Sequence, residues 1–141
     1  MRYYLDTNIL AFLITEQQDE ISEEVKRKIA DYENLFMTSS VCVHELIHLY
    51  QIGKLPFRKG MKAPLPSDVL GWLEEMGIRI VAVGKVHLQQ LSELPMQPDH
   101  RDPNDRLVIA QAIADRIPLV SSDRKFDWYR RHGLEFIFNE R

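Results

Sequence analysis

Four acidic residues, set in separate parts of the sequence, are the strongest candidates for catalytic chemistry. They are Asp6, Glu45, Asp105 and Asp123, and each stands at or near a predicted junction between a strand and a helix. Two carboxylates about 4 Å apart repel by roughly 4 kcal/mol at an effective dielectric of 20. Acids gathered in one place therefore either hold protons to higher pH or bind cations. We expect these four side chains to form a metal site.

The residue types indicate which metal and which reaction. Carboxylate oxygens suit Mg²⁺ or Mn²⁺, ions that keep several water ligands and engage phosphate groups. Such an ion can activate a water for in-line attack on a phosphodiester and can stabilise the leaving oxygen. Thr7, Asn8 and Ser121 lie close to the acids in the sequence. We expect these three side chains to orient the carboxylates or the water.

Each acid also has a simpler explanation when it is taken alone. The sequence from Asp102 to Asp105 is typical of a helix start, with Asp102 at the N-cap and a proline after it. For Asp102 we prefer that structural role, whereas for Asp105 and Asp123 capping and metal binding are equally good explanations. A lone helical Glu45 would usually be solvated. Asp6 is the exception, because an acid at the end of a buried apolar strand needs a partner.

The elements that must position these acids alternate between strand and helix. Short apolar segments predict strands at 3–5, 35–37, 78–83, 119–120 and 134–138. Helical periodicity and capping residues predict helices from about residue 8 to 14, 19 to 33, 40 to 52, 67 to 76, 85 to 94, 104 to 116 and 124 to 132. This alternation predicts a three-layer α/β/α sandwich with a mainly parallel central sheet. Ligands of such sheets bind beyond the carboxyl ends of the strands, where the acids would converge.

Length and composition place limits on the class of protein. A chain of 141 residues fits one domain, residues 1–141, with its own core. The apolar run from Ile9 to Ile14 is too short to span a bilayer, and Asp6 falls where a signal peptide would be apolar. We therefore expect a cytoplasmic protein with no membrane partner. Cys42 is the only cysteine, which excludes an intrachain disulfide and a cysteine-based zinc site, and we expect it to be buried.

The charge balance argues against a dedicated nucleic-acid binder. Lysine and arginine number 18 against 21 acids, a net charge of −3. An enzyme that contacts RNA only briefly remains possible if positive charge is concentrated locally. Two basic segments could supply it. The first is the loop at 54–66 and the second follows Asp123, and the candidate RNA contacts are Lys54, Arg58, Lys59, Arg124 and Lys125. An ordinary solvated surface is the alternative for both segments.

Four segments together resemble one protein family. They are LDTN at 5–8, SVCVHEL at 40–46, HRDPNDRLVIAQA at 100–112 and VSSD at 120–123. This pattern resembles the PIN-domain ribonucleases, and in particular the VapC-like toxins of prokaryotic toxin–antitoxin pairs. The resemblance runs nearly end to end, and the segment at 100–112 is its most specific part. It implies that Asp6, Glu45, Asp105 and Asp123 bind Mg²⁺ or Mn²⁺. It also implies endonucleolytic cleavage of RNA, a homodimer, and inhibition by a small antitoxin.

Three other interpretations compete with this one. The chain could be an inactive PIN-like copy that serves as a binding or assembly module, although all four acids are present. It could be a phosphatase with Asp6 as nucleophile, but such enzymes carry a second acid where this chain has Asn8. A di-iron protein would need two Glu-x-x-His segments, and only the one at Glu45–His48 is found.

Overall fold

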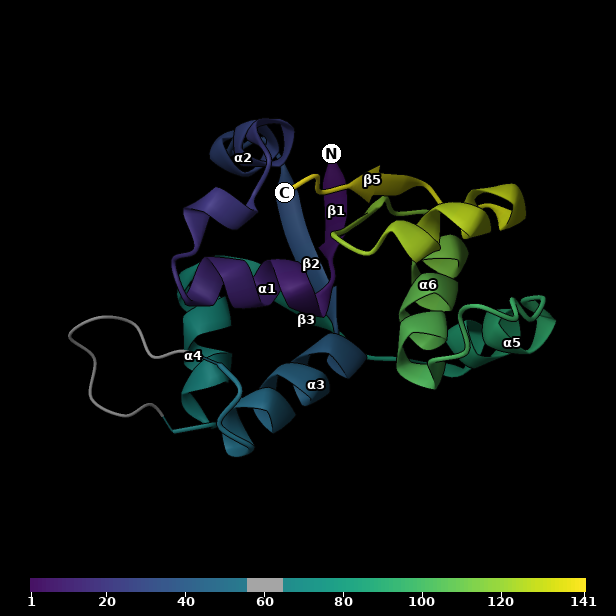
Figure 1. Ribbon diagram of the computed structural model, residues 1–141, viewed down its shortest axis with the longest axis horizontal. Helices are drawn as coiled ribbons and strands as arrows, with labels where there is room; N and C mark the ends of the chain where they lie inside the picture. Colours follow the sequence, from purple (N-terminus) through teal and green to yellow (C-terminus); the bar gives the residue numbers. More distant parts are fainter. Residues whose placement is uncertain (56–64) are drawn as a thin grey trace.

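A parallel sheet forms the centre of the protein. The computed structural model describes residues 1–55 and 65–141, and within these ranges five strands pair in the order β3-β2-β1-β4-β5 (Figure 1). The strands are β1 (Arg2–Leu5), β2 (Leu35–Ser39), β3 (Ile78–Val81), β4 (Leu119–Ser121) and β5 (Phe136–Phe138). Every neighbouring pair is parallel. The predicted α/β fold class is therefore confirmed.

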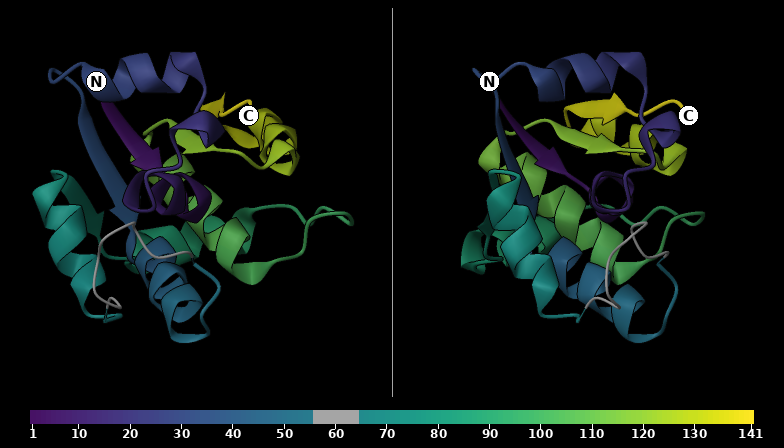
Figure 2. Two further views of the ribbon diagram at one scale, coloured as in Figure 1. Left: turned by 60° about the vertical axis from the view of Figure 1, so that its left-hand side comes forward. Right: turned by 90° about the vertical axis from the view of Figure 1, so that its left-hand side faces the viewer.

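Helices lie on both sides of this sheet (Figures 1 and 2). The α-helices are α1 (Thr7–Ile14), α2 (Glu23–Ala30), α3 (Ser40–Gln51), α4 (Asp68–Glu75), α5 (Lys85–Glu93) and α6 (Pro103–Asp115). Two 3₁₀ helices, η1 (Gln18–Glu20) and η2 (Arg124–His132), complete the described elements. In residues 1–55 and 65–141, no helix is both long enough and apolar enough to cross a membrane.

The central strand β1 shows why both faces must be covered. Successive side chains of a strand point to opposite faces. The Tyr4 hydroxyl donates a hydrogen bond to Asp115 on α6, whereas the ring of Tyr3 lies beneath the ammonium group of Lys28 on α2. Tyr3, Tyr4 and Leu5 are all buried, as expected of a parallel strand covered on both faces.

The register of the strands brings several chain segments to one edge of the sheet. Leu5 pairs with Val120, and the backbone N–H of Asp6 donates to the carbonyl of Val120 at 3.0 Å. The carboxyl ends of β1 and β4 therefore lie side by side. At this edge α3 contacts both α1 and α6, and α1 also contacts β4. Helix α6 runs antiparallel to the strands, so its N-terminus lies at the same edge (Figure 1).

Two elements differ from their sequence prediction. The helix expected over 19–33 is interrupted, because the Ser22 hydroxyl accepts from the N–H of Val25 and so starts α2 at Glu23. The segment at 124–132 forms a 3₁₀ helix rather than an α-helix, and it ends at Gly133 in the left-handed conformation, φ 99°.

Candidate active site

The four candidate acids lie together at the carboxyl edge of the sheet. They line a single cavity of about 160 Å³ together with residues of α1 and α3. Asp6 follows β1, Glu45 lies on α3, Asp105 is in the first turn of α6, and Asp123 follows β4. Each side chain thus comes from a different segment, and the fold brings the four to one place.

Asp6 is buried and almost fully provided with hydrogen-bond donors. Its Oδ1 accepts from the backbone N–H of Thr7 at 2.8 Å, and its Oδ2 accepts from the Ser121 hydroxyl at 2.7 Å. The Asn8 amide also donates to Oδ2 at 3.3 Å. These bonds fix the carboxylate against both the start of α1 and the end of β4.

Asn8 holds these two segments together. Its amide nitrogen donates to the Ser121 hydroxyl at 3.2 Å, and its amide oxygen accepts from the backbone N–H of Ser122 at 3.2 Å. The Ser121 oxygen in turn accepts from the backbone N–H of Asp123 at 3.1 Å. The position of Asp123 relative to Asp6 therefore depends on Asn8 and Ser121.

Glu45 reaches the cavity from one side of α3. Its Oε2 accepts from the Thr7 hydroxyl at 3.2 Å, which ties α3 to the start of α1. The Cys42 thiol, one turn earlier on α3, lies 3.7 Å from Oδ1 of Asp6. Cys42 is fully buried, as the sequence predicted, and burial raises the pKa of its thiol.

Asp105 sits in the first turn of α6, next to the residue that caps the helix. The Asp102 side chain accepts from the backbone N–H groups of Asn104 and Asp105, which confirms its predicted N-cap role. The carboxylate of Asp105 contacts His100, whose Nε2 lies 3.1 Å from Oδ2. Ligand atoms of His100, Asp105 and Asp123 all lie within 4.8 Å of one another.

The acids raise one another's pKa values. Burial raises the pKa of Asp6 to about 6, and the charge of Asp105 adds to the rise. Burial and then the charge of Asp102 raise the pKa of Asp105 to about 7, with Glu45 and Asp123 contributing further. Burial and the charge of Asp6 also raise the pKa of Glu45. This cluster is thus an environment in which a bound cation would be favoured over bound protons.

The donor set fits a divalent metal of the magnesium type. Four carboxylates lining one small cavity offer oxygen ligands, which Mg²⁺ and Mn²⁺ prefer. The hydrogen bonds from Thr7 and Ser121 hold the Asp6 carboxylate in place in the absence of an ion. Metal-binding carboxylates are commonly held by hydrogen bonds of this kind. His100 adds a nitrogen beside Asp105 and Asp123.

His100 is a polar residue beside the acids that sequence reasoning missed. Its ring is buried, with Nδ1 2.8 Å from the Tyr129 hydroxyl and Nε2 beside Asp105. Burial lowers its pKa. A neutral ring satisfies both contacts when Nε2–H donates to Asp105 and Nδ1 accepts from Tyr129. The available signal was its position in the segment at 100–112, five residues before Asp105.

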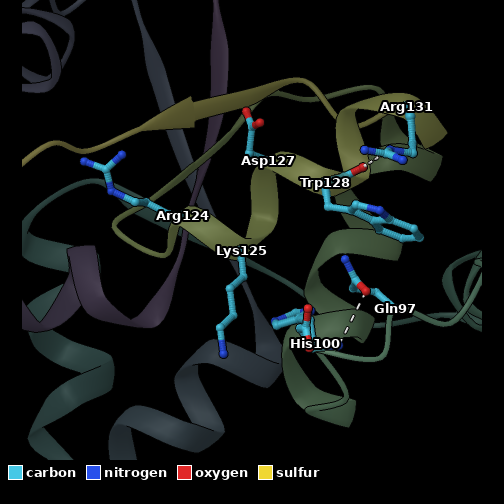
Figure 3. Close-up of a pocket in the computed structure, with 8 residues that line it drawn as sticks. Gln97, His100, Arg124, Lys125, Asp127, Trp128 and Arg131 are labelled. Atoms are coloured by element: carbon cyan, nitrogen blue, oxygen red, sulfur yellow. Dashed lines mark hydrogen bonds between the residues drawn. The ribbon is translucent and has the colours of Figure 1, made fainter.

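The candidate RNA contacts divide into three groups. Lys54 is exposed in the turn after α3, and Arg58 and Lys59 lie outside the described residues. Arg124 and Lys125 line a second cavity of about 620 Å³ between η2 and the segment around His100 (Figure 3). His100 lines this second cavity while contacting Asp105 in the first.

Comparison with known protein families identifies the fold. The PIN domain family matches residues 3–131. The chain belongs to the PIN domain family. No curated protein sequence matches the chain. The resemblance to PIN-domain ribonucleases drawn from the sequence is therefore confirmed at the level of the domain family.

Solved structures similar to this PIN domain come from several bacteria. A chain of VapBC2 from Rickettsia felis, crystallised with a DNA fragment from its promoter, is 22% identical with a TM-score of 0.72, and the match covers 99% of this chain and 100% of that one. A chain of VapBC-1 from nontypeable Haemophilus influenzae is 18% identical with a TM-score of 0.67, covering 98% of each chain.

A third similar structure is VapBC-5 from Mycobacterium tuberculosis, a member of the VapBC family of toxin–antitoxin systems. It is 14% identical with a TM-score of 0.57, and the match covers 99% of this chain and 98% of that one. At these identities the likeness shows a shared fold.

Proposed function

We propose that this PIN domain is a metal-dependent endoribonuclease and the toxin of a toxin–antitoxin pair. One observation carries the proposal: the carboxylates of Asp6, Glu45, Asp105 and Asp123 line one cavity at the carboxyl edge of the sheet. The raised pKa values of Asp6 and Asp105 support it, because mutual repulsion creates a demand for positive charge. The proposal treats residues 1–141 as one catalytic domain.

In this proposal the four acids hold Mg²⁺ or Mn²⁺. The bound metal would neutralise phosphate charge and activate water for attack on the phosphodiester. The surrounding residues fix the acids in place. Thr7 orients Glu45, whereas Asn8 and Ser121 orient Asp6 and the segment leading to Asp123. The backbone N–H of Lys125 donates to the Asp123 carboxylate. The Lys125 ammonium group would contact a phosphate of the RNA backbone.

The proposal includes partners and a location. The likeness to VapBC structures supports a small antitoxin that inhibits the enzyme. A homodimer, which the sequence resemblance implies, and a cytoplasmic location, which the short apolar run and Asp6 led us to expect, are further parts of the proposal. Size-exclusion chromatography with light scattering would test the dimer directly.

The phosphatase alternative conflicts with the surroundings of Asp6. A nucleophilic carboxylate must present a free oxygen to the substrate. Asp6 is 5% exposed, and both its oxygens accept hydrogen bonds, from Thr7 on one side and from Ser121 and Asn8 on the other. This arrangement suits a fixed ligand better than an attacking group.

The decisive experiment is RNA cleavage by the purified chain, free of any partner protein. We expect cutting with Mg²⁺ or Mn²⁺, none with chelator, and none with Asp6→Asn or Asp105→Asn. The matched control is Asp19→Asn, which neutralises an exposed acid on η1 that does not line the cavity. Cleavage by Asp105→Asn at the rate of the unaltered chain would refute the proposal. Absence of cutting under every metal would favour an inactive binding module.

A further inference from the structure

The cavity beside the acids has the composition of a nucleotide site. Its volume is about 620 Å³, and its lining includes an indole ring, a buried imidazole, an amide and three basic side chains. These residues are Trp128, His100, Gln97, Arg124, Lys125 and Arg131. Ligand pockets commonly have volumes of about 300–1,000 Å³ and combine aromatic surface with a few polar groups in this way.

Trp128 and Arg131 provide a stacking surface. The Arg131 guanidinium lies 5.0 Å from the centre of the indole ring, and its Nε donates to the backbone carbonyl of Trp128 at 3.1 Å. Figure 3 shows the indole between Arg131 and Gln97 at the side of the cavity. Unpaired RNA bases stack on aromatic rings and on guanidinium planes, and this stacking tolerates any base.

The charge of the cavity favours a phosphate-bearing ligand. Two acids, Asp99 and Asp127, line it beside the three basic side chains, and Asp127 is paired with Arg130 through a 2.6 Å contact. Lys125 extends from η2 in the direction of His100 (Figure 3). Its positive charge lowers the pKa values of both His100 and Asp105, so the ammonium group acts on the acid cluster as well.

His100 joins this cavity to the acid cluster. Its ring lines the basic cavity, while its Nε2 lies 3.1 Å from Asp105. A ligand in the basic cavity is therefore next to the four carboxylates. A nucleotide placed there would hold its own phosphodiester near the acids, whereas an acidic peptide would gain nothing from that proximity.

We infer that this cavity binds one unpaired nucleotide of the RNA substrate, next to the bond that is cut. The base stacks on Trp128 and Arg131, Lys125 contacts the adjoining phosphate, and the Gln97 amide reads the edge of the base. This inference rests on the proposed nuclease function and adds a specificity site to it.

The test measures binding without cleavage. Asp105→Asn protein is titrated with labelled, unstructured oligomers of A, C or U in chelator, and fluorescence anisotropy gives the affinity. In a Trp72→Phe background the remaining tryptophan is Trp128, so its quenching by unlabelled oligomer reports stacking at this cavity. The Trp72 ring packs at a tilt against Tyr50, with 5.5 Å between the ring centres, a contact that phenylalanine can retain.

We expect Trp128→Ala to weaken oligomer binding about tenfold and Trp128→Phe to weaken it much less. Arg131→Gln should weaken binding and lower its salt dependence, whereas Arg27→Gln, a matched exposed arginine on α2, should do neither. Gln97→Ala should reduce the difference in affinity between A, C and U oligomers. If Trp128→Ala lowers the melting temperature, Arg131→Gln and Gln97→Ala decide the question, because neither side chain belongs to the buried core.

The outcomes separate this inference from the proposed function. Saturable quenching of Trp128 with no metal-dependent cleavage would remove the nuclease assignment and leave the nucleotide site. The nucleotide site alone would be overturned if cleavage depended on metal while oligomer affinity and base preference were unchanged in every cavity variant, and Trp128 quenching was unchanged in Arg131→Gln and Gln97→Ala. Binding of a peptide partner that depends on Trp128, with no binding of RNA, would also overturn it.

Discussion

His100 and Asp105 are joined by a contact of 3.1 Å between the imidazole Nε2 and a carboxylate oxygen. The other ring nitrogen lies 2.8 Å from the hydroxyl of Tyr129, which itself accepts from Arg106 at 3.3 Å. Arg106 is anchored to the carbonyls of Leu94 and Pro95. Asp105 thus stands at the end of a buried chain of hydrogen bonds.

This chain makes His100 a positioning residue for Asp105. We expect His100→Ala to weaken metal binding by about 10–100-fold, the usual cost of losing a group that orients a ligand. His100→Gln should recover part of this loss, because its amide can still donate to the carboxylate. Isothermal calorimetry with Mn²⁺ measures the effect. Metal affinity unchanged in His100→Ala would show that Asp105 needs no support from the ring.

Removal of Asp105's charge should stabilise the metal-free protein at neutral pH. The carboxyl has a pKa of about 7 in the folded chain and of roughly 4 when unfolded. Below pH 4 the Asp105 carboxyl is protonated in both the folded and the unfolded state, so it has no effect on the free energy of unfolding. As the pH rises from about 4 to 7 the unfolded state loses its proton first, so ionisation increasingly favours unfolding.

The full penalty is therefore present above about pH 7. The difference between the two pKa values corresponds to about 4 kcal/mol for a carboxyl shielded from water, and solvent screening of a side chain that is 26% exposed lowers this to about 2 kcal/mol. We therefore expect Asp105→Asn to raise the apo melting temperature by about 5 °C near pH 8 and to have little effect near pH 4. Thermal unfolding by circular dichroism in chelator measures both. Asp19→Asn serves as the control and should change neither value. An equal shift at both pH values would mean that charge is not the cause.

Bound metal should make the unaltered chain more stable than Asp105→Asn, the reverse of the order expected without metal. A ligand that binds only the folded state raises the melting temperature according to its concentration relative to Kd, by about 2.7 kcal/mol at a hundredfold excess. We expect Mn²⁺ to raise the melting temperature of the unaltered chain and to leave that of Asp105→Asn nearly unchanged. A monovalent salt at the same ionic strength controls for general screening of the acids. A similar rise in melting temperature in both proteins would show that the metal binds outside the acid cluster.

Tyr4→Phe should reduce stability without affecting the acid cluster. The Tyr4 hydroxyl donates to Asp115, which also accepts from His87 at 2.9 Å, and this network links β1 to α5 and α6. Burial raises the pKa of Tyr4, so the hydroxyl keeps its proton at neutral pH. Loss of the hydroxyl should cost about 1–2 kcal/mol in urea unfolding. RNA cleavage at a temperature where the variant is folded should be unchanged.

Much of the fold follows from local sequence, whereas part of the site does not. Strand–helix alternation was sufficient to predict the parallel sheet, and the rule that ligands lie beyond the strands' carboxyl ends placed Asp6 and Asp123 together. Asp102 could be recognised as an N-cap from the proline that follows it. Each of these features could be predicted from short segments of sequence together with a general rule for parallel sheets.

The parts that sequence missed depend on packing between distant segments. His100 became visible as a site residue only because Tyr129, twenty-nine positions later, packs against it and leaves Nε2 facing Asp105. Likewise, the sequence marked Arg124 and Lys125 only as basic. Their place beside Gln97 and His100 depends on how η2 packs against the segment that carries those two residues.

The rate at which Cys42, the single thiol of the protein, is alkylated can report how often the site opens. Cys42 is fully buried and lies 3.7 Å from the carboxylate of Asp6, with burial raising its pKa. An alkylating reagent can reach the sulfur only when α3 separates from the start of α1. The labelling rate therefore reports the free energy of that local opening, with no added probe. Slower labelling in the presence of Mn²⁺ or an inhibitory partner would measure how firmly each one holds the site closed.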